Sequence, residues 1–75
     1  MEFNASFSMQ DTLKQAETEK IKVALRLRNG EMLTGLVGSV GDNQLVLTHL
    51  VGREFYDALV RIDEIAAIEA QVRKK

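Results

Sequence analysis

The chain has 75 residues and a formal net charge of −1, so we expect one domain with a limited core that gains stability from self-association. It has no cysteine and a single histidine, His49, which excludes disulfides and a structural zinc site within one chain. The near-neutral charge argues against a non-specific nucleic-acid binder, because such proteins carry a broad basic face.

No segment of the sequence suggests export or insertion into a membrane. The first residues lack a basic start followed by an apolar segment, and no run approaches the roughly 20 apolar residues of a membrane span. The absence of cysteine is compatible with a reducing compartment. We therefore expect a cytoplasmic protein without a membrane partner.

The N-terminal part predicts a loose arm over residues 1–7 and a short helix over residues 9–20. Ser8 and Asp11 resemble a capping box, in which the serine side chain caps the start of the helix. Behind them, apolar residues recur at helical spacing and predict a helix that lies over one open side of the β-structure. These residues are Met9, Leu13 and Ala16.

From Lys20 the apolar period changes to two, which predicts a strand with one face in the core. The apolar positions are Ile21, Val23, Leu25 and Leu27. The opposite face carries three basic residues that predict a solvated face, with a functional basic stripe as the alternative: Lys22, Arg26 and Arg28. Asn29-Gly30 follows and favours a tight hairpin turn of type I′.

The second predicted strand covers residues 32–40 and contains two glycines, Gly35 and Gly38. Glycine inside a strand marks a bend or a close approach of another backbone, so both have a structural explanation. A turn over residues 41–44 then leads into a third strand over residues 45–50, without room for a helix.

The remaining predicted elements are two further strands joined by short connections. Residues 50–53 predict a hairpin turn, residues 54–62 a fourth strand, and residues 63–64 a very short link. Residues 65–70 are compatible with a helical turn or a fifth strand, and we favour the strand because four strands leave edges that need covering. Residues 71–75 predict a basic tail.

A helix followed by five short antiparallel strands predicts a mainly β fold, namely an SH3-like small barrel formed by residues 8–70. Two stretches in it resemble the two signatures of the Sm/LSm family of ring-forming RNA-binding proteins, which includes bacterial Hfq. The first stretch contains Val23-x-Leu25-x-Leu27, Asn29-Gly30, Gly35-x-Val37, the loop over residues 41–44 and Leu45-x-Leu47. The second covers residues 60–68, with Ile62 where the family has glycine.

The resemblance implies a cyclic homo-oligomer that binds single-stranded RNA at its pore. Strand four of one subunit would pair with strand five of the next, and rings of five, six or seven subunits all remain open. Two loops of each subunit would face the pore and read exposed bases by hydrogen bonds. Carried over to this sequence, the RNA-binding residues are Asp42, Asn43, Gln44, Arg61 and Asp63.

Each of these residues also has a simpler interpretation. Asp42 and Asn43 are favoured in turns whatever the function, and Arg61 has acidic partners nearby in Asp57, Asp63 and Glu64. The loop over residues 41–44 contains no aromatic side chain for stacking. The alternative function is therefore a structural or protein-interaction ring that has lost RNA binding.

Enzymatic activity has little support in the sequence. We find no nucleophile with a base, no carboxylate pair at a defined spacing and no cofactor motif, so we expect no enzyme and no cofactor. His49 lies beside a turn and predicts a surface residue, and Tyr56 is expected to be half-buried or at an interface.

Overall fold

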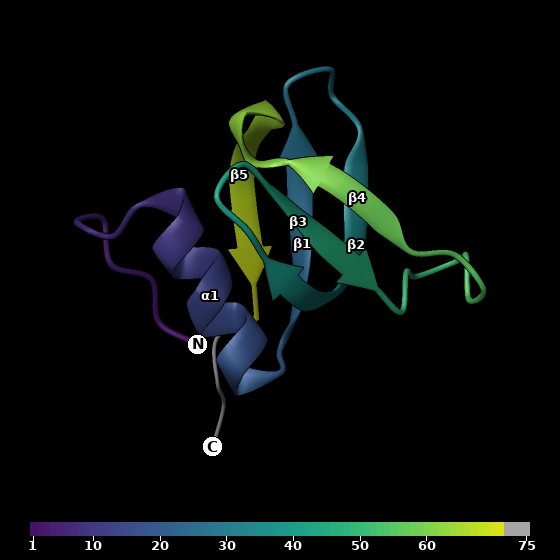
Figure 1. Ribbon diagram of the computed structural model, residues 1–75, viewed down its shortest axis with the longest axis horizontal. Coiled ribbons are helices and arrows are strands. Elements are labelled where there is room, and N and C mark those ends of the chain that lie inside the picture. Colours follow the sequence, from purple (N-terminus) through teal and green to yellow (C-terminus); the bar gives the residue numbers. More distant parts are fainter. Residues whose placement is uncertain (72–75) are drawn as a thin grey trace.

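The fold consists of one helix followed by five strands (Figure 1). The computed structural model describes residues 1–71. The elements are α1 (Met9–Glu19), β1 (Lys22–Leu27), β2 (Met32–Val40), β3 (Gln44–Thr48), β4 (Ala58–Arg61), the 3₁₀ turn η1 (Ile62–Glu64) and β5 (Ile65–Ala70). The predicted mainly β class and the order of one helix and five antiparallel strands are confirmed.

Helix α1 begins where the sequence predicts. The Ser8 hydroxyl accepts a hydrogen bond of 3.0 Å from the Asp11 backbone N–H, which satisfies one of the free donors at the start of the helix. The helix ends at Glu19, because Lys20 adopts a left-handed conformation with φ of 56°. The capping interaction and the extent of the predicted helix are thus confirmed to within one residue.

The five strands form one antiparallel sheet in the order β4-β3-β2-β1-β5. The sheet of the predicted SH3-like small barrel is not closed, since β4 and β5 lie at opposite edges and do not pair with each other. The physical reason lies in η1. This turn connects β4, which pairs with β3, to β5, which pairs with β1. Each of the two strands is therefore hydrogen-bonded along one side only, and its other side is a free edge of the sheet.

The hairpin between β1 and β2 is confirmed, but its turn is not of type I′. A type I′ turn needs positive φ at both central residues, and in this loop only Gly30 has it, with φ of 93°. The Gly30 N–H donates to the Leu27 carbonyl at 2.9 Å, and the Leu27 N–H donates to the Glu31 carbonyl at 2.8 Å. The connection is therefore a three-residue loop, with glycine at its last position.

Strand β2 has the predicted bounds, and its glycines lie where the strand bends. A Cβ at Gly35 would overlap the carbonyl oxygen of Thr48 and lie 3.3 Å from the side chains of Leu47 and Leu50. The pairing of β2 with β3 shifts register between Val37 and Ser39, and such bulges bend a strand. The expected close backbone approach is confirmed at Gly35.

The third and fourth strands are shorter than predicted. Strand β3 ends at Thr48 because His49 takes a left-handed conformation with φ of 52°. The predicted turn over residues 50–53 is present, with a hydrogen bond of 3.1 Å from the Arg53 N–H to the Leu50 carbonyl. A second turn follows, in which the Tyr56 N–H donates to the Arg53 carbonyl at 3.0 Å. Residues 54–57 therefore stay outside the sheet, and β4 begins only at Ala58.

The link between β4 and β5 is short, as predicted, but it includes Ile62, which the sequence placed in strand four. The N–H of Ile62 donates to the Asn43 carbonyl at 2.9 Å, and the Glu64 carbonyl accepts from the Arg28 N–H at 2.9 Å. Both bonds tie η1 to neighbouring loops. Residues 65–70 form strand β5, so the predicted fifth strand is confirmed and the alternative of a helical turn is wrong.

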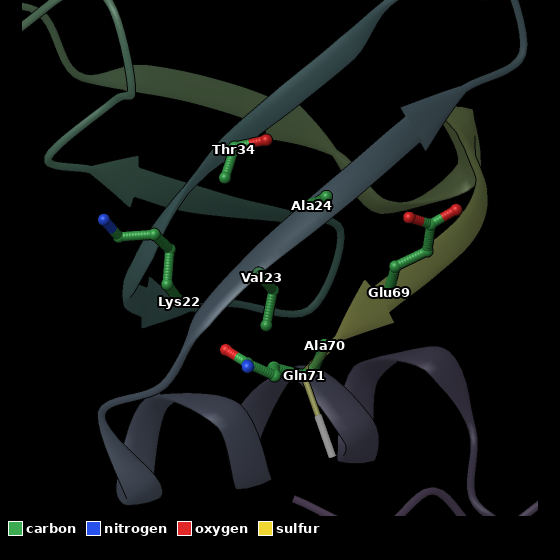
Figure 2. Close-up of a pocket in the computed structure, with 7 residues that line it drawn as sticks. All are labelled: Lys22, Val23, Ala24, Thr34, Glu69, Ala70 and Gln71. Atoms are coloured by element: carbon green, nitrogen blue, oxygen red, sulfur yellow. The ribbon is translucent and has the colours of Figure 1, made fainter. Parts of the chain in front are cut away.

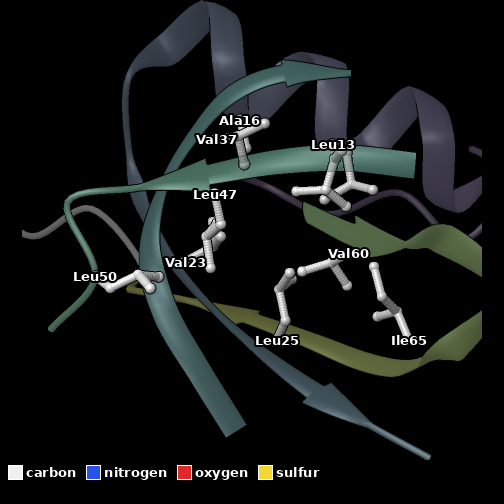
Figure 3. Packing of buried hydrophobic residues seen from close by; sticks show 10 residues of the cluster. Leu13, Ala16, Val23, Leu25, Val37, Leu47, Leu50, Val60 and Ile65 are labelled. Atoms are coloured by element: carbon white, nitrogen blue, oxygen red, sulfur yellow. The ribbon is translucent and has the colours of Figure 1, made fainter. Parts of the chain in front are cut away.

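The core lies between α1 and the concave side of the bent sheet. Figure 3 shows side chains from the helix and from all five strands converging there. The buried apolar residues are Leu13, Ala16, Val23, Leu25, Val37, Leu45, Leu47, Leu50, Val60 and Ile65. The helix thus covers the sheet with the residues predicted for that role.

The chain ends add two observations. In the arm before α1, Met1 packs against the core and its amino group lies 4.0 Å from a carboxylate oxygen of Glu19. Residues 72–75 of the predicted basic tail lie outside the described part of the chain. Within the described part, no helix has the length and apolar character needed to cross a membrane.

The Gly35 contact predicts a position where a single methyl group destabilises the fold. Gly35→Ala should lower the free energy of unfolding by about 1–3 kcal/mol, because either β2 or β3 must move. Urea denaturation followed by circular dichroism measures this. Ser39→Ala on the same strand, at an exposed position, serves as the control and should change stability by less than about 0.5 kcal/mol. Equal stability of both variants would contradict the assigned contact.

Candidate functional site

Two loops that are distant in the sequence meet at one corner of the sheet. The loop between β2 and β3 contains Asp42 and Asn43, and the chain leaves β4 for η1 at Arg61. Gln44 pairs with Arg61 across the β3–β4 ladder, and the Asn43 carbonyl accepts the hydrogen bond from Ile62. The end of one strand pair thereby fixes the relative position of both loops.

The predicted site residues lie together at this corner. An open hollow of about 450 Å³, which we call the loop hollow, is lined by Gly41, Asp42, Asn43, Gln44 and Arg61. A smaller hollow of about 180 Å³ adjoins the loop hollow, and its lining also includes Ile62 and Asp63. All five predicted site residues are exposed, so their side chains are accessible to a ligand from solvent.

Arg61 is held by Asp63, one of the acidic partners considered from the sequence. Its Nε donates to Oδ1 at 3.2 Å and its Nη2 donates to Oδ2 at 2.9 Å, which makes a two-point contact. This hydrogen bond, together with the negative charge of Asp63, raises the pKa of Arg61. The guanidinium is charged at any physiological pH, and the two-point contact turns it toward Asp63.

The chemistry of the loop hollow is that of a hydrogen-bonding surface. Asn43 and Gln44 each offer an amide with donors and an acceptor, Asp42 offers acceptors, and Arg61 offers donors and a positive charge. The described residues contain no group of His, Cys, Asp and Glu side chains suited to a metal ion. Such a surface fits the polar edge of a base or of a peptide.

Sequence reasoning missed one contact that shapes this corner. The side-chain amide of Gln10, in the first turn of α1, donates to the Gly41 carbonyl at 2.7 Å. The bond spans 31 residues and ties the helix to the loop between β2 and β3. No local sequence pattern marks it, because it depends on where the helix lies on the sheet.

The other singled-out residues lie away from this corner. His49 is exposed as expected, with its Nδ1 3.0 Å from the Thr48 hydroxyl. Tyr56, expected to be half-buried or at an interface, is 65% exposed within the single chain. The alternation that predicts its burial is absent, because residues 54–57 lie outside the sheet.

A second hollow, which the sequence did not predict, lies on the other side of the sheet from the core. It has a volume of about 380 Å³ and is lined mainly by residues of β1, β2 and the end of β5 (Figure 2). Ala24 pairs with Thr34 on one side and with Glu69 on the other. The small alanine between two larger side chains leaves the depression, which we call the strand hollow.

Comparisons with known proteins add no relative. No model of a known protein family matches the chain, and a search of curated proteins finds no match.

The exposed Arg61–Asp63 pair predicts site variants that remain folded. Arg61→Gln and Asp63→Asn should each leave the melting temperature within about 2 °C of the parent, because exposed ion pairs add little to stability. Thermal denaturation by circular dichroism tests this. Arg26→Gln is the matched control, since it removes the looser exposed pair with Glu69 at 3.8 Å. A much lower melting temperature for the site variants alone would show that the corner depends on this pair.

Proposed function

We propose that the chain is an Sm-like protein with an SH3-like fold, which assembles into a cyclic homo-oligomer and binds single-stranded RNA through the loop hollow. The observation that carries this proposal is the convergence of Asn43, Gln44 and Arg61 on one exposed corner. Asn43 lies in the loop between β2 and β3, and Gln44 and Arg61 are the paired end residues of β3 and β4, next to the two loops to which the resemblance assigns RNA contact. Their convergence depends on the fold and not on their positions in the sequence.

The sheet edges support the assembly part of the proposal. A strand at an edge presents unpaired N–H and C=O groups that can bond to a further strand. Strands β4 and β5 are both edges, and each has its free side away from the sheet. Pairing β4 of one copy with β5 of the next would satisfy both edges and repeat into a closed ring.

The side chains at the corner suit exposed bases. Asparagine and glutamine amides match the donor and acceptor pattern of a base edge, and arginine adds a charge for the phosphate or a plane for stacking. A ring would bring one loop hollow from every copy to the same end of the assembly. Several weak contacts would then act together on one RNA strand.

Two features favour the alternative, a structural or protein-interaction ring without RNA. Asp42 and Asp63 give this corner more negative than positive charge, and Arg61 is already held by Asp63. The lining contains no aromatic side chain, and base stacking contributes about 1–3 kcal/mol per base where it occurs. An acceptor-rich surface of this kind also suits peptide N–H groups.

Binding of fluorescently labelled oligouridine and oligoadenosine at low and moderate salt tests the proposal. The parent should bind as an oligomer, with an affinity that falls steeply as salt rises, since phosphate contacts release counterions. The double variant Asn43→Ala, Arg61→Ala should bind at least about ten-fold more weakly while keeping its native mass.

Arg26→Ala is the control, because it removes the same charge from the outer side of the sheet. It should bind RNA as the parent does. A parent ring that binds neither oligonucleotide would overturn the RNA proposal and favour the protein-interaction ring.

A further inference from the structure

Three large apolar side chains are exposed beside the free edge of β4. Phe55 is 97% exposed, Tyr56 65% and Leu59 66%. The two aromatic residues belong to the turns that precede β4, and Leu59 lies within it on the outer side, because its neighbour Val60 is buried. Large apolar side chains exposed beside an unpaired strand are typical of a surface that is covered by a partner.

The opposite edge of the same sheet offers a complementary surface. The strand hollow of about 380 Å³ lies at the end of β5, where Glu69, Ala70 and Gln71 form one of its sides (Figure 2). Ala67 and Glu69 lie on the outer side of β5, opposite Arg26 and Ala24 of β1. Ala24 and Ala70 are the small members of the lining and leave the space that a side chain from outside the chain could fill.

Strand polarity brings these two surfaces together between copies. Every ladder among residues 1–71 is antiparallel, and we take the same polarity for β4 of one copy against β5 of the next. The residues that precede β4 then lie beside those that end β5. Phe55 and Tyr56 stand two or three residues before Ala58, within about 10 Å of chain at about 3.3 Å per residue.

We infer that the Phe55–Tyr56 turn of one copy packs into the strand hollow of a second copy, with Leu59 against Ala67. The inference rests on the ring assembly proposed above and names the side chains that stabilise it. The occupant is a second copy of this chain because the aromatic turn and the hollow flank the two edges that would pair.

Assembly of a double variant provides the first test. Phe55→Ser, Tyr56→Ser should raise the concentration at which the oligomer dissociates by at least about ten-fold, as loss of aromatic interface anchors does. Sedimentation velocity over a dilution series measures this. Phe3→Ser, Phe7→Ser is the matched control, because it removes two aromatic residues that are 48% and 47% exposed elsewhere. The control should dissociate as the parent does.

Cross-linking provides the second test, since the natural chain has no cysteine. Phe55→Cys and Glu69→Cys are prepared separately, mixed, and treated with a short bismaleimide. A covalent dimer containing both variants is expected. The control mixture of Phe55→Cys and Arg28→Cys should give none, because Arg28 follows the far end of β1.

The outcomes separate this inference from the proposed function. A parent that stays monomeric at every concentration overturns the ring and the inference together. A parent that assembles, with an equally stable Phe55→Ser, Tyr56→Ser variant and no cross-link between positions 55 and 69, overturns the inference alone. If that variant keeps its mass but no longer binds oligouridine, the aromatic turn contacts RNA and the inference is again overturned.

Discussion

The close approach of β2 and β3 at Gly35 is the constraint on which the rest of the fold depends. The absence of a side chain there lets the Thr48 carbonyl approach the β2 backbone, and the nearby register shift at Gly38 bends the same strand. As the middle strand of five, β2 sets the curvature of the whole sheet. That curvature forms the concave surface on which α1 packs, and it gives a chain of this size a single enclosed core.

The turn η1 brings the two loops of the candidate site together. It connects strands that are consecutive in the sequence but lie at opposite edges of the sheet. Its hydrogen bond from Ile62 to Asn43 places Arg61 beside the loop between β2 and β3. One short turn therefore accounts for both the loop hollow and the two free edges. RNA binding and assembly, as proposed, are linked because both depend on this turn.

The sequence predicted the elements whose signals are local. Ser8 marks the start of α1 because capping is a short-range interaction, and β2 is bounded by turn residues at both ends. The strand predicted over residues 54–57 is wrong. The aromatic pair there favours a strand, but the positive φ at Gly52 and a second turn keep these residues out of the sheet. The candidate site residues were proposed from the order of motifs, and the structure places them at one corner. The strand hollow was not predicted, because it depends on the register that places Ala24 between Thr34 and Glu69.

The central claim is that RNA is bound where the two loops converge, and hydrogen–deuterium exchange with mass spectrometry tests it most directly. Exchange is followed at assembling concentration with and without oligouridine. We expect slower exchange on RNA binding in peptides covering residues 41–44 and 61–64, with little change in the turns over residues 50–57. Protection confined to other segments, with unchanged exchange in both loops, would contradict it.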